Sequence, residues 1–182
     1  AVNLTSTGLD LHGPAATVQG TYLRFTGLEL PADAKITNAY HSFTVRDAST
    51  AAQSTMLNIT GELGTQAAFA STVASFTSRT FTNAAVSMST PAVVANSIFN
   101  TNDLTSVINE MRANTADLKD YVFKINGNGV GSFVMRSFDS SATMAPKLVI
   151  EYTSTSGDYA ASISNTSDDA EERGTANAID LN

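Results

Sequence analysis

The stretch AKITNAYHSFTVR, residues 34–46, is the clearest indicator of the fold. Its residues form two alternating sets, Ala39, His41, Phe43 and Val45 in one and Asn38, Tyr40, Ser42 and Thr44 in the other. Successive side chains of a β-strand point to opposite faces of the sheet. The stretch therefore predicts a strand with one buried face and one face toward solvent.

Similar stretches, bounded by Gly, Pro, Asn and Asp, recur along most of the chain. They predict strands at residues 22–30, 55–63, 84–89, 120–126, 132–138 and 147–153. The alternation changes parity at Gly27, which predicts a bulge there. The sequence Asn-Gly-Asn-Gly at 126–129 predicts a tight hairpin turn, because Asn and Gly tolerate positive φ.

One segment has a helical period instead. Leu104, Val107, Ile108 and Met111 follow the i, i+3, i+4, i+7 spacing, which predicts a short amphipathic helix at about 102–113, with Asn102 or Asp103 as its cap. Residues 64–83 and 90–101 are interpreted as long connections anchored by isolated Phe residues. The predicted fold is all-β, a jelly-roll-type antiparallel β-sandwich with one short helix and an extended acidic C-terminal tail.

Charge divides the chain into two parts. The net charge is −7 over 182 residues, and residues 1–153, with 11 acids and 9 bases, contribute −2 of it. Residues 154–182, with six acids and one base, contribute −5. We therefore expect a β-sandwich module at 1–153 and an acidic linker or tail at 154–182, which would open a next module or donate a strand to a neighbouring subunit.

Composition narrows the classes of function. Lys and Arg number only 10 in all, so binding to a nucleic-acid backbone is not expected. No run approaches 18 apolar residues, so no membrane insertion is expected. There is no Cys, only two His, and no nucleophile or zinc motif, so the chain is not expected to be an enzyme. Many Thr and Ser with few Lys are typical of a secreted bacterial surface protein.

Several motifs together resemble a known family. Residues 22–27 (YLRFTG), 30–40 (LPADAKITNAY) and 43–44 (FT) are similar to the "LRF-G…P-GA-I-NAY…F" core of tandem β-sandwich modules in large secreted bacterial proteins, related to DNRLRE-type and carbohydrate-binding-like jelly rolls. Residues 136–141, 145–146 and 148–152 resemble the closing strand of these modules, and 167–172 (SDDAEE) resemble the acidic signature that opens one. The resemblance implies a repeated module at the bacterial cell surface.

Calcium is the candidate cofactor, and no other cofactor is expected. Asp168, Asp169, Glu171 and Glu172 place four carboxylates within five residues, and hard cations prefer several oxygen ligands. The alternative is a solvated acidic loop. Asp10 or Asp139 would complete a calcium site, and the ion would stiffen the joint between consecutive modules.

The two ends of the sequence are alike. AVNLT at 1–5 and AIDLN at 178–182 share the order Ala, β-branched, Asp or Asn, Leu, polar. This likeness leads to the main hypothesis, an extracellular structural or adhesive module whose partner is itself, through strand complementation between neighbours. The expected interface residues are apolar ones near the two ends, namely Val2, Leu4, Leu9, Leu11, Ile179 and Leu181.

A carbohydrate-binding module, calcium-dependent and with a polysaccharide as partner, is the alternative hypothesis. The available stacking and hydrogen-bonding groups are Tyr22, Tyr40, Arg24 and Arg136. Aromatic residues that alternate along a sandwich strand more often belong to the core, so the core interpretation stays open beside this one.

Overall fold

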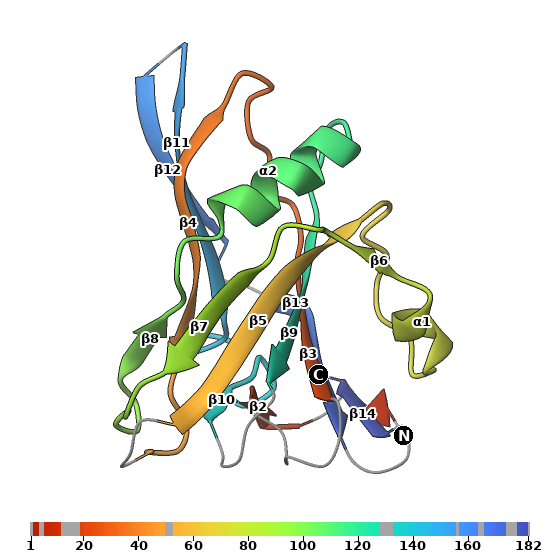
Figure 1. The fold of residues 1–182 in the computed structure, drawn as a ribbon, viewed down its shortest axis with the longest axis vertical. Coiled ribbons are helices and arrows are strands. Elements are labelled where there is room, and N and C mark those ends of the chain that lie inside the picture. Colours follow the sequence, from red (N-terminus) through yellow and green to blue (C-terminus); the bar gives the residue numbers. More distant parts are fainter. Residues whose placement is uncertain are drawn as a thin grey trace.

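The computed structural model describes residues 2–3, 6–11, 19–49, 53–127, 133–155, 157–163, 166–173 and 178–181. For residues 2–3, 19, 53–55, 158–163, 166–173 and 178–181 the description covers the backbone alone. Most of the described chain is β-strand, and the strands form two main sheets that face each other (Figure 1). The predicted all-β sandwich with a short helix is confirmed.

The larger sheet has eight strands and forms one layer. Its order is β1 (Val2–Asn3), β14 (Ala178–Leu181), β13 (Thr166–Arg173), β3 (Gln19–Phe25), β9 (Tyr121–Gly127), β5 (Gln53–Leu63) and β6 (Thr80–Phe81), with β7 (Val86–Thr90) also paired to β5. Every pairing in this sheet is antiparallel except that of β1 with β14.

The smaller sheet has four antiparallel strands. Its order is β12 (Gly157–Ile163), β11 (Lys147–Ser154), β4 (Lys35–Thr44) and β8 (Ile98–Asn100). Strand β4 is the segment whose alternation predicted a half-buried strand, and its even-numbered positions are indeed more exposed than Ala39, His41 and Phe43, which are fully buried. These three residues face the core between the sheets.

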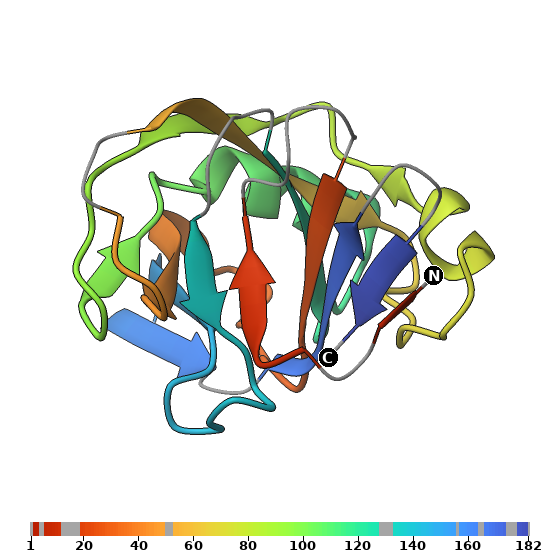
Figure 2. The same cartoon turned by 90° about the horizontal axis from the view of Figure 1, so that it is seen from below.

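The core is closed at both ends of the sandwich. Helix α2 (Thr105–Asn114) contacts β4 and β5 and lies across one end. Strands β2 (Gly8–Asp10) and β10 (Val134–Arg136) pair at the opposite end, as Figures 1 and 2 show. The helix buries the predicted apolar stripe, Leu104, Val107, Ile108 and Met111, each 0% exposed.

The start of α2 is fixed by Asp103. Its Oδ1 accepts hydrogen bonds from the Thr105 N–H at 2.9 Å and from the Ala39 N–H of β4 at 3.0 Å. Burial opposes ionisation of this carboxyl, but the hydrogen bonds from Thr105 and Ala39 outweigh it and hold the pKa of Asp103 below its ordinary value. The N-cap residue is Leu104 and not the predicted Asn102 or Asp103, and Asp103, just before it, joins the helix to the small sheet.

Two local predictions are wrong. Strand β3 ends at Phe25, and Gly27, with φ of 76°, follows it in a loop where its N–H donates to Asp120 Oδ1, so no bulge forms there. Strand β9 pairs with β3 and β5, and β10 pairs with β2, so the two do not make the hairpin expected from the Asn-Gly-Asn-Gly sequence. Residues 128–132 lie outside the described part of the chain.

Residues 64–83 are more ordered than the predicted long connection. They include the short helix α1 (Ala74–Thr77) and strand β6, and they cover the outer face of the large sheet (Figure 1). A small second cluster forms there, in which Tyr22 of β3 and Phe76 are buried and Phe69, Val73 and Phe81 pack around them.

The C-terminal region contributes strands to both sheets. Strand β12 pairs along its whole length with β11, and β13 pairs with β3. The segment around Asp168, for which a solvated acidic loop is one of the two expectations, is the extended strand β13. Strand pairing thus continues past residue 153, where the sequence predicted the end of the module.

Candidate functional site

The edge formed by β1, β14 and β13 brings the two similar ends of the chain together. Strand β14 lies between β1 and β13, and β1 runs parallel to it. Val2 is opposite Ile179 and Asn3 is opposite Asp180, which is the alignment in which the two sequences resemble each other. Asn3 of β1 and Asp180 of β14 also each pair with Glu171 of β13.

Strand β13 in turn covers β3. Asp168 is opposite Arg24 and Asp169 is opposite Leu23, with a register shift between Thr166 and Asp168. Leu23 and Phe25 of β3 are 0% exposed and belong to the main core. The edge of a core strand is therefore closed by a segment more than 140 positions later in the sequence.

The predicted interface residues divide into two groups. Val2, Ile179 and Leu181 lie on β1 and β14 at this edge. Leu9 and Leu11 are instead 0% and 1% exposed in the main core, so they hold the small β2–β10 end of the sandwich and are not available to a neighbour. Leu4 lies outside the described residues.

The predicted calcium ligands come from separate places. Asp168, Asp169, Glu171 and Glu172 lie on β13, where only the backbone is described. Asp10 ends β2 opposite Val134, and its Oδ1 accepts a hydrogen bond from the Phe133 N–H at 3.2 Å. Asp139 lies beyond the other end of this pairing, where Arg136 is opposite Gly8. Among the side chains that the structure describes, no three His, Asp or Glu lie close enough together to hold a metal ion.

The predicted sugar-binding residues do not share a surface. Tyr22 is only 2% exposed, because residues 64–83 cover it, and its ring lies 4.8 Å from that of Phe76, edge to face. It therefore cannot serve as a surface platform. Tyr40 is half-buried on β4 of the other sheet, opposite Val149.

The two arginines lie on strands that do not pair with each other, and both are held by the protein itself. Arg24 on β3 donates from Nη2 to Asp120 Oδ2 at 2.7 Å and from Nε to the Gln66 carbonyl at 2.9 Å. Arg136 on β10 donates from Nη2 to Asn96 Oδ1 at 2.7 Å. The geometry thus assembles no sugar site from these four residues, and glycan binding stays a prediction.

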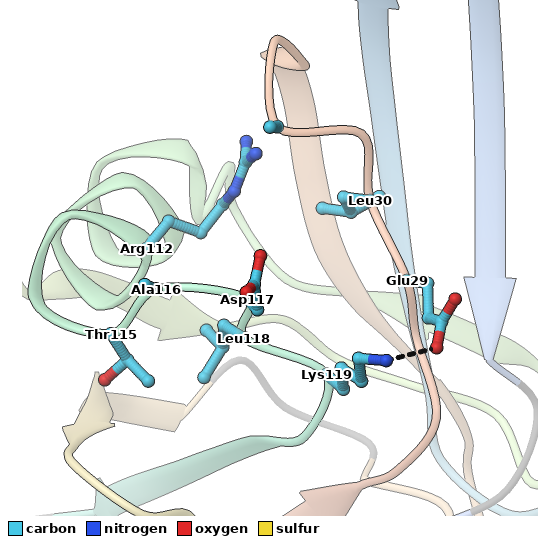
Figure 3. Close-up of a pocket in the computed structure, with 9 residues that line it drawn as sticks. Glu29, Leu30, Arg112, Thr115, Ala116, Asp117, Leu118 and Lys119 are labelled. Carbon is cyan, nitrogen blue, oxygen red and sulfur yellow. Dashed lines mark hydrogen bonds and ion pairs between the residues drawn. The ribbon is translucent and has the colours of Figure 1, made fainter.

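A cavity of about 470 Å³ lies between the 29–32 loop and the segment that follows α2 (Figure 3). The Arg112 guanidinium forms part of its wall and donates hydrogen bonds to the Ala34 and Pro31 carbonyls at 2.7 and 2.9 Å. At the rim Lys119 Nζ lies 2.6 Å from Glu29 Oε1. This hydrogen bond lowers the pKa of Glu29 and raises that of Lys119.

The cavity is lined by Glu29, Leu30, Ala32, Arg112, Thr115, Ala116, Asp117, Leu118 and Lys119. None of these residues is aromatic, so the lining offers no ring on which a sugar could stack. Its two cationic groups already contact carbonyls or a carboxylate. The arrangement ties the end of α2 to the 29–34 loop.

A buried ion pair was not anticipated from the sequence. Arg79 contacts Glu62 of β5 at the base of the 64–83 segment, and the two side chains are 6% and 7% exposed. Burial raises the pKa of Glu62, and the neighbouring Arg79 opposes that rise. The spaced Phe residues of the same segment are the available sign of a small buried cluster. Arg79 borders this cluster, since its guanidinium lies 4.9 Å from the centre of the Phe69 ring.

No family model matches the chain, and no curated protein matches it. In the part of the chain that the structure describes, neither helix has the length and apolar character needed to cross a bilayer.

Proposed function

We propose that this chain is a non-catalytic structural module of the bacterial cell surface that acts by repetition, with copies joined by strand pairing at the β1–β14–β13 edge. The main support for the proposal is that the two similar ends of the sequence, β1 and β14, pair with β13 in the same register. Asn3 and Asp180, at equivalent positions in the two similar sequences, each pair with the same residue, Glu171. One chain thus contains two strands suited to the same neighbour.

Sheet edges support such a role on general grounds. An edge strand presents unpaired N–H and C=O groups that can pair with another chain, and main-chain hydrogen bonds provide much of the affinity in strand addition. The body is close to neutral, with −2 over residues 1–153, so charge repulsion between bodies is weak. With no Cys in the sequence, disulfides cannot join successive units.

Calcium is the proposed cofactor of this edge. On the extended strand β13, Asp169 and Glu171 lie on one face and Asp168 and Glu172 on the other, so a cation would bind residues of one face and not all four. A calcium ion bound there would strengthen the pairing that joins copies.

The proposal is tested by the assembly state of the full chain. We expect light scattering and negative-stain microscopy to show multimers or filaments that increase with protein concentration. I179P removes a backbone N–H from β14, which should reduce assembly because proline cannot donate to the strand pairing.

A95P is the matched control. Ala95 is exposed and follows Val94 in a turn in which the Ser97 N–H donates to the Val94 carbonyl, and Asn96 has a φ of 65°. Proline is favoured at this position of a type II turn, so A95P should assemble like the unaltered chain. A chain that stays monomeric at every concentration, or equal assembly of both variants, would overturn the proposal.

A further inference from the structure

The edge of β3 must be covered for the sandwich to be stable. β3 pairs with β9 on one side and with β13 on the other, and its residues Leu23 and Phe25 lie in the main core. Without β13, the seven-residue strand β3 would become an exposed edge, which is a template for pairing with another chain. A β13 strand from the same chain and one from another copy would form the same residue pairs with β3.

The remaining contacts of the C-terminal region allow β13 and β14 to separate from the body. β12 belongs to the small sheet and pairs with β11 over seven residue pairs, whereas β13 and β14 belong to the large sheet. Transfer of β13 and β14 to another copy therefore breaks none of the β11–β12 pairs. The same set of strand pairs is formed before and after such an exchange.

Charge directs the exchanged strand toward β3. Residues 168–173 carry four acids and one Arg, so two β13 strands paired together would place like charges side by side, which destabilises a sheet. On β3, the position opposite Asp168 is occupied by Arg24. An acidic strand beside a strand that carries a cation is the favourable combination.

We infer that residues 166–181, the β13–β14 pair, are exchanged between copies of this chain: the pair from one copy occupies the β3 edge of the next, where β1 of the receiving copy pairs with it. The inference rests on the proposed function and identifies its donor and acceptor. A second copy is the partner because its β13–β14 pair carries the residues already matched to this edge.

Engineered cysteines test the exchange directly, since the natural sequence has none. Opposed residues of an antiparallel pair have Cα atoms about 4.5–5.5 Å apart, within the range of about 4.4–6.8 Å that disulfides bridge. When R24C chains and D168C chains are mixed, assembled and oxidised, we expect disulfides between an R24C chain and a D168C chain. The control mixture, N38C with E151C, uses a β4–β11 pair that stays within one chain and should give none.

The double variant R24C/D168C, oxidised as a dilute monomer, fixes β13 to its own β3. We expect the oxidised chain to assemble less than the same chain after reduction, and only these two states are compared, because both lack the Arg24–Asp168 charge pair. The equivalent N38C/E151C lock should assemble whether oxidised or reduced. If the oxidised R24C/D168C chain assembles as well as its reduced form, the exchange is wrong while self-assembly stands; if the N38C/E151C chain and the unaltered chain never assemble, the proposed function itself fails.

Discussion

Arg79 and Glu62 form an ion pair that is almost completely enclosed, although both lie near the outer face of the large sheet. Arg79 also donates hydrogen bonds from Nε to the Ser75 carbonyl at 2.6 Å and from Nη2 to the Ala67 carbonyl at 2.7 Å. One guanidinium therefore connects β5 to the 64–83 segment at two places, Ala67 and Ser75.

Replacing Arg79 should be costly. R79A leaves the Glu62 carboxylate buried without its partner, and breaking a buried pair in this way costs about 3–5 kcal/mol in the free energy of unfolding. Urea unfolding measures the loss. K119A is the control, because its pair with Glu29 is exposed, at 58% and 70%, and should change little. Equal effects of the two variants would contradict the structural role given to Arg79.

Because His41 is buried, we expect the protein to lose stability in mild acid. It is 0% exposed, its ring lies 4.5 Å from that of Phe123, and neither ring nitrogen has a hydrogen-bond partner among the described residues. Burial lowers the pKa of His41 from 6.5 to about 3. Between these two values the unfolded chain binds a proton at His41 that the folded chain does not, so the contribution of His41 to stability is constant above pH 6.5 and falls below it.

The expected slope is about 1.4 kcal/mol per pH unit, or about 2 kcal/mol between pH 6.5 and pH 5. Urea unfolding at a series of pH values measures it. H41F keeps an aromatic ring at the site and should remove this part of the pH dependence. If H41F follows the same curve as the unaltered protein, another group is responsible.

Gly61 of β5 allows α2 to approach the sheet. A methyl group added at Gly61 would lie 2.2 Å from Met111 Sδ and 2.9 Å from Val107 Cγ1. G61A should therefore destabilise the protein by about 1–3 kcal/mol through overpacking. In a double-mutant cycle with M111A, the double variant should lose less than the sum of the single losses. Strict additivity would show that the two positions do not compete for this space.

Calcium removal gives a prediction for the acidic strand. If the ion binds the folded edge, millimolar calcium should raise the melting temperature and a chelator should reverse the rise. A chain in which Asp168, Asp169, Glu171 and Glu172 are replaced by their amides should melt at one temperature with or without calcium. The same calcium shift in both proteins would place the ion elsewhere, and no shift in the unaltered chain would exclude calcium as a stabilising ligand.

Alternation and helical period predicted most elements of the sandwich. Stretch 34–46 became β4 because burial really does alternate along it, with Ala39 and Phe43 buried and Tyr40 partly exposed. Helix α2 followed its apolar stripe for the same reason, since each member of the stripe is buried. Both patterns involve residues that are close in sequence, so they can be recognised in a single sequence.

Pairing between distant segments could not be predicted in the same way. Residues 168–172 have no apolar alternation, so nothing local marks them as a strand, and β13 exists through its pairing with β3. The sequence does not show that Tyr22 is buried, because its cover, residues 64–83, reads as a long connection. The spaced Phe69, Phe76 and Phe81 were the available sign of a small core, and they surround Tyr22 in the fold.

The distance in sequence between Arg24 and its opposite residue Asp168 also has a consequence for biosynthesis. Contacts between remote positions form slowly, because the intervening chain must first lose its freedom. During translation, β3 and β9 are complete well before β13 leaves the ribosome. Until then, the edge of β3 that β13 covers stays exposed in the nascent chain. Several ribosomes translating one message would bring such unfinished chains close together, and the earliest β13 to arrive at an open flank would decide whether a unit closes on itself or onto its predecessor.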